Sequence, residues 1–82
     1  MYKIRYIQEQ LSDDFAKIPL EARREAIKYF KLFEKDYDKY TLPLYDMNGR
    51  NLQGCRKTYF GDAKYRIISK PVNGIINIIN IV

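Results

Sequence analysis

Histidine and tryptophan are absent from this 82-residue sequence, and Cys55 is its single cysteine. A lone cysteine cannot form a disulfide within the chain, and without histidine the usual ligands of a zinc site are missing. The side chain that most often exchanges protons near neutral pH is missing too. Any proton-transfer chemistry must therefore use lysine, arginine, tyrosine or a carboxylate, and we expect neither a metal ion nor an organic cofactor.

Long apolar runs are also scarce. The most extended one, residues 75–82, is far too short to span a bilayer. Near the N-terminus, Lys3 and Arg5 stand where a signal peptide would have its apolar core. A chain of this length makes one small domain with a thin core. We therefore expect a single domain over residues 1–82, located in the cytoplasm and with no membrane partner.

Acidic residues are nearly absent from residues 50–70. This segment contains one acid, Asp62, and six basic residues: Arg50, Arg56, Lys57, Lys64, Arg66 and Lys70. Residues 1–49 contain nine basic and nine acidic side chains and residues 71–82 contain none, so this one segment accounts for the formal net charge of +5. Such a local excess favours an anionic partner, most simply the phosphate backbone of a nucleic acid. The solvated face of an antiparallel sheet is the alternative explanation.

The N-terminal half predicts one strand followed by two helices. Residues 2–7 alternate apolar and basic side chains, which is typical of a half-buried strand. The run Ser12–Asp14 offers capping side chains and negative charge, and it predicts the start of a short helix. Pro19 either ends that helix or lies in the first turn of the next one.

The second helix has the clearest pattern. Its apolar stripe has helical spacing, with Ile27 beside it, and ends near Tyr40 before the breaker Thr41-Leu42-Pro43. The members of the stripe are Ala26, Phe30, Phe33 and Tyr37. We expect this stripe to form the core.

The C-terminal half predicts a loop over residues 41–54 and then three strands, at residues 55–60, 63–70 and 75–82. The pair Asn73-Gly74 predicts a tight hairpin between the last two. The expected fold is α+β, with helices packed on one face of a mainly antiparallel three-strand meander. The last strand is apolar and uncharged, and we expect it at a sheet edge, where a second copy of the chain would pair with it.

The sequence resembles the RelE/ParE superfamily of bacterial toxins. The resemblance is carried by Phe15–Pro19, then Leu52–Phe60, and then Lys64–Ile68 with its tyrosine-arginine pair, and it covers nearly the whole chain. It implies a RelE/ParE-like fold for the single domain. RelE-type members are ribosome-dependent mRNA endonucleases that a cognate antitoxin neutralises. The implied partners are therefore the ribosome, mRNA and an antitoxin, for which the last strand is a plausible docking site.

The resemblance also implies site residues. Arg66 matches the family's strand arginine, which contacts the scissile phosphate. Lys57, with Arg56 beside it, matches the basic residues of the preceding strand, which would serve as base or charge stabiliser. Tyr65 matches a family tyrosine in type, although strand alternation puts it on the face opposite Arg66. The expected RNA-binding set is Arg50, Arg56, Lys57, Lys64, Tyr65 and Arg66.

One departure from the family pattern leaves a second hypothesis open. In the family, the last strand runs into a glycine-lysine-arginine segment and a C-terminal tyrosine or histidine, whereas this sequence ends at Val82. The expectation is that this C-terminal part of the family's active site is lacking. The alternative function is therefore a catalytically inactive RelE/ParE-fold binding module, a class that includes a ParE-like gyrase inhibitor.

Overall fold

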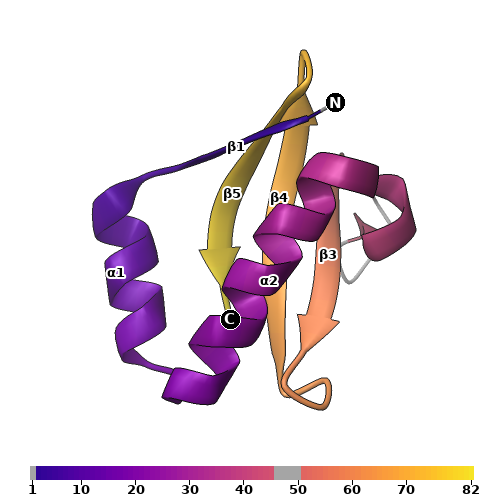
Figure 1. Ribbon diagram of the computed structural model, residues 1–82. Coiled ribbons are helices and arrows are strands. Elements are labelled where there is room, and N and C mark those ends of the chain that lie inside the picture. The colour runs from indigo at the N-terminus through magenta and orange to yellow at the C-terminus, as the bar shows by residue number, and fades with distance from the viewer. Residues whose placement is uncertain (1, 46–50) are drawn as a thin grey trace.

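The fold consists of a five-stranded sheet with one long helix across it and a short helix at its side (Figure 1). This computed structural model describes residues 2–45 and 51–82, with the side chains of residues 45 and 51–53 left out. The elements are β1 (Lys3–Tyr6), α1 (Gln8–Ala16), α2 (Leu20–Asp36), the 3-10 helix η1 (Asp38–Tyr40), β2 (Leu42–Tyr45), β3 (Asn51–Phe60), β4 (Tyr65–Val72) and β5 (Ile75–Ile81). The predicted α+β fold class is confirmed.

The last strand lies inside the sheet. The strand order is β1-β5-β4-β3-β2, in which β1 runs parallel to β5 and the other pairs are antiparallel. The parallel pair aligns Lys3 with Ile75 and Tyr6 with Ile78. The prediction that β5 lies at an edge is therefore wrong, because the N-terminal strand returns to cover it. A second copy or an antitoxin would have to displace β1 to pair there.

Helix α1 covers the part of the β5 edge that β1 does not reach. The helix begins at Gln8, so the prediction that Ser12–Asp14 starts it is wrong. Asp14 is instead buried in its last two turns and accepts hydrogen bonds from Gln10 Nε2 at 3.0 Å and from the backbone N–H of Ile81 at 2.9 Å. The carboxylate therefore satisfies a strand donor beyond the end of β1, where a further strand would otherwise do so.

The segment predicted as a loop contains strand β2, at the far edge of the sheet. Leu42 aligns with Lys57 and Pro43 with Arg56 of β3. An edge strand tolerates Pro43 because its missing N–H can lie on the unpaired side. The loop prediction is wrong for these residues, and β3 begins at Asn51, before the predicted strand. The predicted turn at Asn48-Gly49 falls outside the described residues.

The predicted stripe of α2 does form the core. Ala26 and Phe33 are fully buried, and they pack with Ile67 of β4 and Ile76 of β5. Ile27 points to solvent, with 44% of its surface exposed, so its expected place beside the stripe is wrong. Pro19 directly precedes the helix. An N–H at this position would make no hydrogen bond within the helix, so proline is tolerated there.

The predicted hairpin at residues 73–74 is confirmed. Asn73 and Gly74 have φ angles of 52° and 81°, and they join β4 to β5. Positive φ at both central residues is typical of a type I′ turn, whose twist matches that of the flanking strands.

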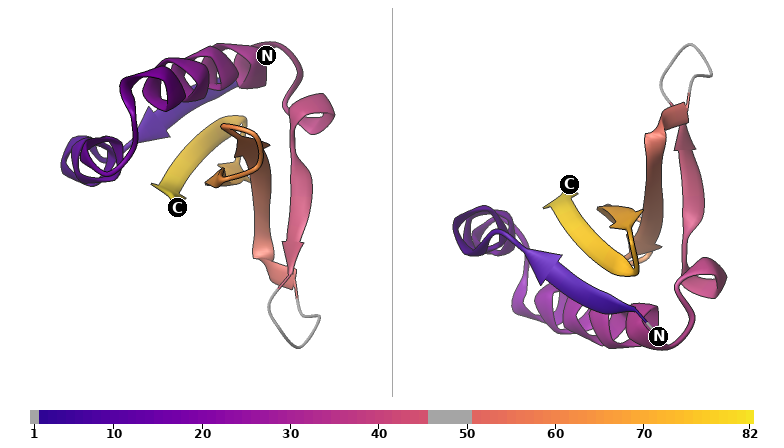
Figure 2. Two further views of the ribbon diagram at one scale, coloured as in Figure 1. Left: turned by 90° about the horizontal axis from the view of Figure 1, so that it is seen from below. Right: turned by 90° about the horizontal axis from the view of Figure 1, so that it is seen from above.

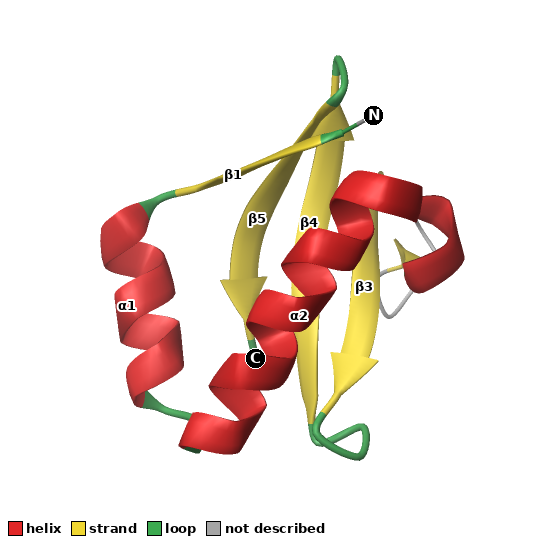
Figure 3. Cartoon of the chain, in the orientation of Figure 1, coloured by secondary structure: helices red, strands yellow, loops and turns green. Residues whose placement is uncertain are grey.

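The two faces of the sheet differ in what covers them. Viewed end-on, α2 lies along one face, and among the described residues no helix lies over the other (Figure 2). Coloured by type, the long helix α2 crosses in front of β3, β4 and β5, while α1 stands beside them (Figure 3). The five strands contain six basic residues and no acidic one, since the acids of the described residues all lie in helices or turns. The charged side chains of the sheet are therefore all cations.

Candidate nucleic-acid interface

Two cationic side chains and a phenol meet on the uncovered face: Lys57, Arg66 and Tyr59. Lys57 and Tyr59 are two residues apart on β3, so they point to the same side of the sheet. Arg66 of β4 is the direct cross-strand partner of Tyr59. The Lys57 amino nitrogen lies 5.2 Å from the centre of the Tyr59 ring. Two cations therefore flank one phenol.

These cations change the chemistry of the phenol. A hydrogen bond from Lys57 and the positive charge of Lys57 lower the pKa of Tyr59, and the charge of Arg66 lowers it further. Tyr59 is 42% exposed, so its hydroxyl is open to a ligand. The arrangement is suited to attract a phosphate and to accept a proton beside it.

Arg56 lies on the other face of the sheet, although it is next to Lys57 in sequence. Its Nε donates a hydrogen bond of 2.6 Å to Thr41 Oγ1, and Nη2 donates one of 3.1 Å to the Thr41 carbonyl. The guanidinium also lies 5.9 Å from the ring centre of Tyr37. In this position Arg56 ties β3 to the end of η1, and the structure does not bring it together with Arg66.

Tyr65 and Lys64 also lie outside this cluster. Tyr65 packs against Phe60, with ring centres 5.6 Å apart, on the face that α2 covers. Lys64 is exposed in the turn between β3 and β4 and lines a hollow with Glu21 and Glu25 of α2. Arg50 is outside the described residues. Of the predicted residues, the structure brings together Lys57 and Arg66.

Tyr59 belongs to this cluster but was not among the site residues predicted from the sequence. Its signal was the spacing Lys57-x-Tyr59, which puts both side chains on one face, and its position before the turn that leads to Arg66. The cross-strand register depends on where that turn lies. Gly61, Asp62 and Ala63 all have positive φ there, and the alignment of Tyr59 with Arg66 becomes visible only once the turn is fixed.

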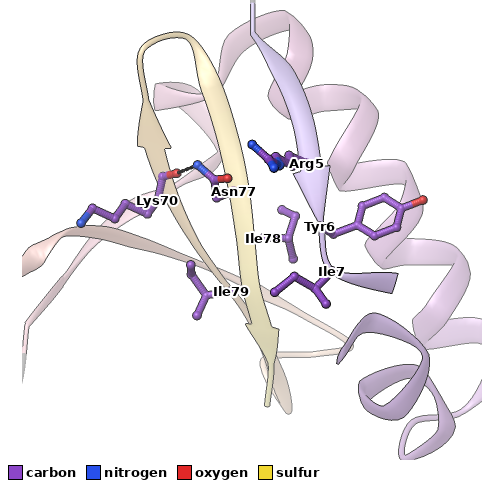
Figure 4. A pocket seen from close by; sticks show the side chains of 7 residues that line it. All are labelled: Arg5, Tyr6, Ile7, Lys70, Asn77, Ile78 and Ile79. Carbon is purple, nitrogen blue, oxygen red and sulfur yellow. Dashed lines mark hydrogen bonds between the residues drawn. The ribbon is translucent and has the colours of Figure 1, made fainter. Parts of the chain in front are cut away.

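A groove of about 410 Å³ lies at the opposite end of the sheet, along β1 and β5 (Figure 4). It is lined by Arg5, Tyr6, Ile7, Lys70, Asn77, Ile78 and Ile79. Ile7 is 72% exposed and Ile79 46% exposed. The Asn77 side chain donates a hydrogen bond of 3.3 Å to the Lys70 carbonyl. The groove therefore combines exposed aliphatic side chains with two cations, a composition that suits a partner with apolar and acidic groups.

A second hollow, of about 310 Å³, lies where η1 meets β3. Its lining consists of Tyr29, Lys39, Tyr40, Thr41, Leu42, Thr58 and Tyr59. Tyr59 thus belongs both to this hollow and to the cationic cluster with Lys57 and Arg66.

Within the described residues, no group of three or more histidine, cysteine or acidic side chains is placed to hold a metal ion. None of the helices there has the length and apolar character needed to cross a membrane.

Comparison with known proteins shows similarity in structure. No family model matches the sequence, and no curated protein matches it significantly. The fold is similar to that of a chain in the crystal structure of the toxin–antitoxin complex RelBE2 from Mycobacterium tuberculosis. The TM-score is 0.74 at 14% sequence identity, and the match covers 98% of this chain and 94% of that chain. The RelE-like toxin fold that the sequence predicts is therefore confirmed.

Proposed function

We propose that this protein is a RelE-type toxin that inhibits translation by cleaving mRNA on the ribosome. The observation that carries the proposal is the convergence of Lys57, Tyr59 and Arg66 on an uncovered sheet face whose strands contain no acid. A face of this charge attracts a phosphate backbone, and the phenol between the cations supplies a proton acceptor. The structural similarity to a chain of a toxin–antitoxin complex supports the same function class.

The three side chains have separate roles in this proposal. Arg66 presents a planar fork of donors to two phosphate oxygens, and Lys57 adds a second positive charge. Tyr59 as phenolate takes the proton of the ribose 2′-hydroxyl, and the 2′-oxygen forms a bond to phosphorus. The bond from phosphorus to the 5′-oxygen then breaks, and this oxygen takes a proton from the Lys57 ammonium. The products are a 2′,3′-cyclic phosphate and a 5′-hydroxyl.

The test is cleavage of mRNA on programmed ribosomes. Arg66→Ala is expected to slow cleavage by at least about 100-fold, because it removes the group that stabilises charge in the transition state. Lys31→Ala is the matched control, since Lys31 is an exposed lysine on α2, outside the cluster. Intact mRNA with the wild-type protein would contradict the proposal. Ribosome binding without cleavage would favour the inactive binding module.

A protein antitoxin is the partner that we propose for the groove lined by Arg5 and Lys70. Support comes from the exposed aliphatic side chains Ile7 and Ile79 beside these two cations. A partner segment with apolar side chains and a carboxylate would match this surface. The similar fold found in the RelBE2 toxin–antitoxin complex points to the same class of partner.

A further inference from the structure

Three tyrosines from three elements converge at the hollow between η1 and β3. Tyr29 comes from α2, Tyr40 from η1 and Tyr59 from β3. The rings of Tyr29 and Tyr40 have centres 6.3 Å apart and meet edge to face, with an interplanar angle of 71°. Walls of this kind expose ring faces and edges to whatever enters the hollow.

The walls are held in place by the core and by the backbone. Tyr29 packs on the buried Phe33, with ring centres 6.3 Å apart. Thr58 Oγ1 donates a hydrogen bond of 2.8 Å to the carbonyl of Tyr40, which fixes η1 against β3. Tyr40 and Tyr29 are half-buried, so little side-chain freedom would be lost on binding a ligand.

Cations lie beside two of the three tyrosine rings: Lys39 lines the hollow, and Lys57 lies outside its lining, next to Tyr59. Lys39 Nζ lies 5.5 Å from the ring centre of Tyr40, and Lys57 Nζ lies 5.2 Å from that of Tyr59. The residues that line the hollow include no carboxylate. Aromatic walls accept a flat π system, and the cations beside them accept the negative charge that such a ligand carries.

We propose that this hollow binds one nucleobase of the RNA strand whose phosphate lies against Lys57 and Arg66. The inference rests on the proposed function, since it takes RNA as the ligand. Tyr59 connects the two contacts, because it belongs to the cationic cluster and also lines the hollow. Stacking on tyrosine tolerates every base, so the site would hold the strand with little sequence preference.

The experiment measures the affinity for a fluorescently labelled single-stranded oligoribonucleotide by anisotropy. Tyr40→Leu and Tyr59→Leu keep apolar bulk but remove a ring, and each is expected to weaken binding by about tenfold. Tyr59→Phe keeps the ring and is expected to weaken binding less than Tyr59→Leu does. Tyr6→Leu is the matched control, because Tyr6 is an exposed tyrosine on β1 that lines the other groove.

The salt dependence separates stacking from phosphate contact. The Leu variants remove no cation, so the slope of log affinity against log salt should stay unchanged, whereas Lys57→Ala should reduce it. Unchanged affinity in both Leu variants, or an effect equal to that of Tyr6→Leu, would overturn the inference. Circular dichroism confirms that each variant is folded, and Tyr59→Leu, at an exposed position, carries the test if Tyr40→Leu unfolds.

The experiments distinguish a failure of the nucleobase site from a failure of the proposed function. If the wild-type protein binds no oligoribonucleotide, both proposals fall. If it binds RNA through the tyrosines but leaves mRNA intact on ribosomes, the nucleobase site stands and the cleavage proposal falls. An oligoribonucleotide with one abasic position adds a direct check, because it should bind more weakly to the wild type and equally to Tyr59→Leu.

Discussion

Tyr37 and Tyr59 hold their phenolic protons differently because of where the fold places them. Burial raises the pKa of Tyr37, although its hydrogen bond of 2.7 Å to Ser69 and the charge of Arg56 act in the opposite direction. Lys57 lowers the pKa of Tyr59 on the open face. One phenol is therefore a structural group of the core, and the other is available for proton transfer.

The role of Lys57 in this difference can be measured. Lys57→Gln is expected to raise the pKa of Tyr59 toward its ordinary value, because Lys57 makes the largest contribution to lowering it. NMR of protein labelled with ¹³C-tyrosine reports the titration. Lys70→Gln is the control. Lys70 lies on the same face of β4 as Arg66, but Arg66 and not Lys70 is the cross-strand partner of Tyr59. An unshifted Tyr59 in Lys57→Gln would contradict the assignment.

The same shift gives the proposed cleavage reaction a pH dependence. If the Tyr59 phenolate is the base, the rate rises with pH through the range in which Tyr59 loses its proton. The other charged groups that face Tyr59 are Arg66 across the strand pair and Lys39 across the hollow, and both are cations. Lys57→Gln should therefore displace the rate profile to higher pH.

At the scale of elements, the edge of β5 is closed by two different means. β1 pairs with its first half, and the Asp14 carboxylate of α1 accepts the N–H of Ile81 in its second half. The contact joins residues 67 positions apart, so a single side chain docks α1 onto the sheet. Without it, a buried backbone donor would have no partner there.

The contribution of this contact can be tested by unfolding. Asp14→Ala is expected to lower the free energy of unfolding by about 1–3 kcal/mol, because the Ile81 N–H loses its acceptor. Asp14→Asn keeps an acceptor oxygen and should lose less. Asp13→Ala, at an exposed position of the same helix, should change the value by less than about 0.5 kcal/mol. Equal effects of Asp13→Ala and Asp14→Ala in urea denaturation would contradict this account.

Local patterns were sufficient to predict several elements. The stripe through Phe30 and Phe33 and the Asn73-Gly74 hairpin depend on neighbours in sequence, and the structure has both. The position of β5 depends on β1, more than 70 residues away, and no local pattern contains that pairing. In the site, alternation separates Arg56 from Lys57, but which of them α2 covers is decided by tertiary packing.

At the scale of the whole molecule, acids and bases occupy different layers. The strands carry basic residues alone, while the acids of the described residues lie in the helices and turns. The open face of the sheet presents the cluster of Lys57 and Arg66 on β3 and β4. The groove with Arg5 and Lys70, which Figure 4 shows, lies along β1 and β5. One face would therefore serve RNA and a protein partner at separate places.

Because the two proposed sites lie apart, we expect that the proposed RNA cleavage and the proposed antitoxin binding can be altered independently. Ile79→Asp introduces a carboxylate into the groove. If the chain is the toxin proposed above, this variant is expected to escape neutralisation by the proposed antitoxin while growth arrest persists. Ile27→Asp is the matched control, because Ile27 is about equally exposed but lies on α2, outside the groove. Coexpression of each variant with the proposed antitoxin, read out as growth, measures the effect. Neutralisation of Ile79→Asp as efficient as that of the wild type would contradict the proposed docking surface.

The parallel pairing of β1 with β5 also orders events during synthesis. β1 leaves the ribosome first, yet its partner strand Ile75–Ile81 is made more than 70 residues later. Contacts of such high sequence separation form late in folding. The sheet that carries Lys57 and Arg66 therefore lacks its full support until β5 has emerged. A chain still being translated would not yet present the finished basic face to the ribosome that makes it.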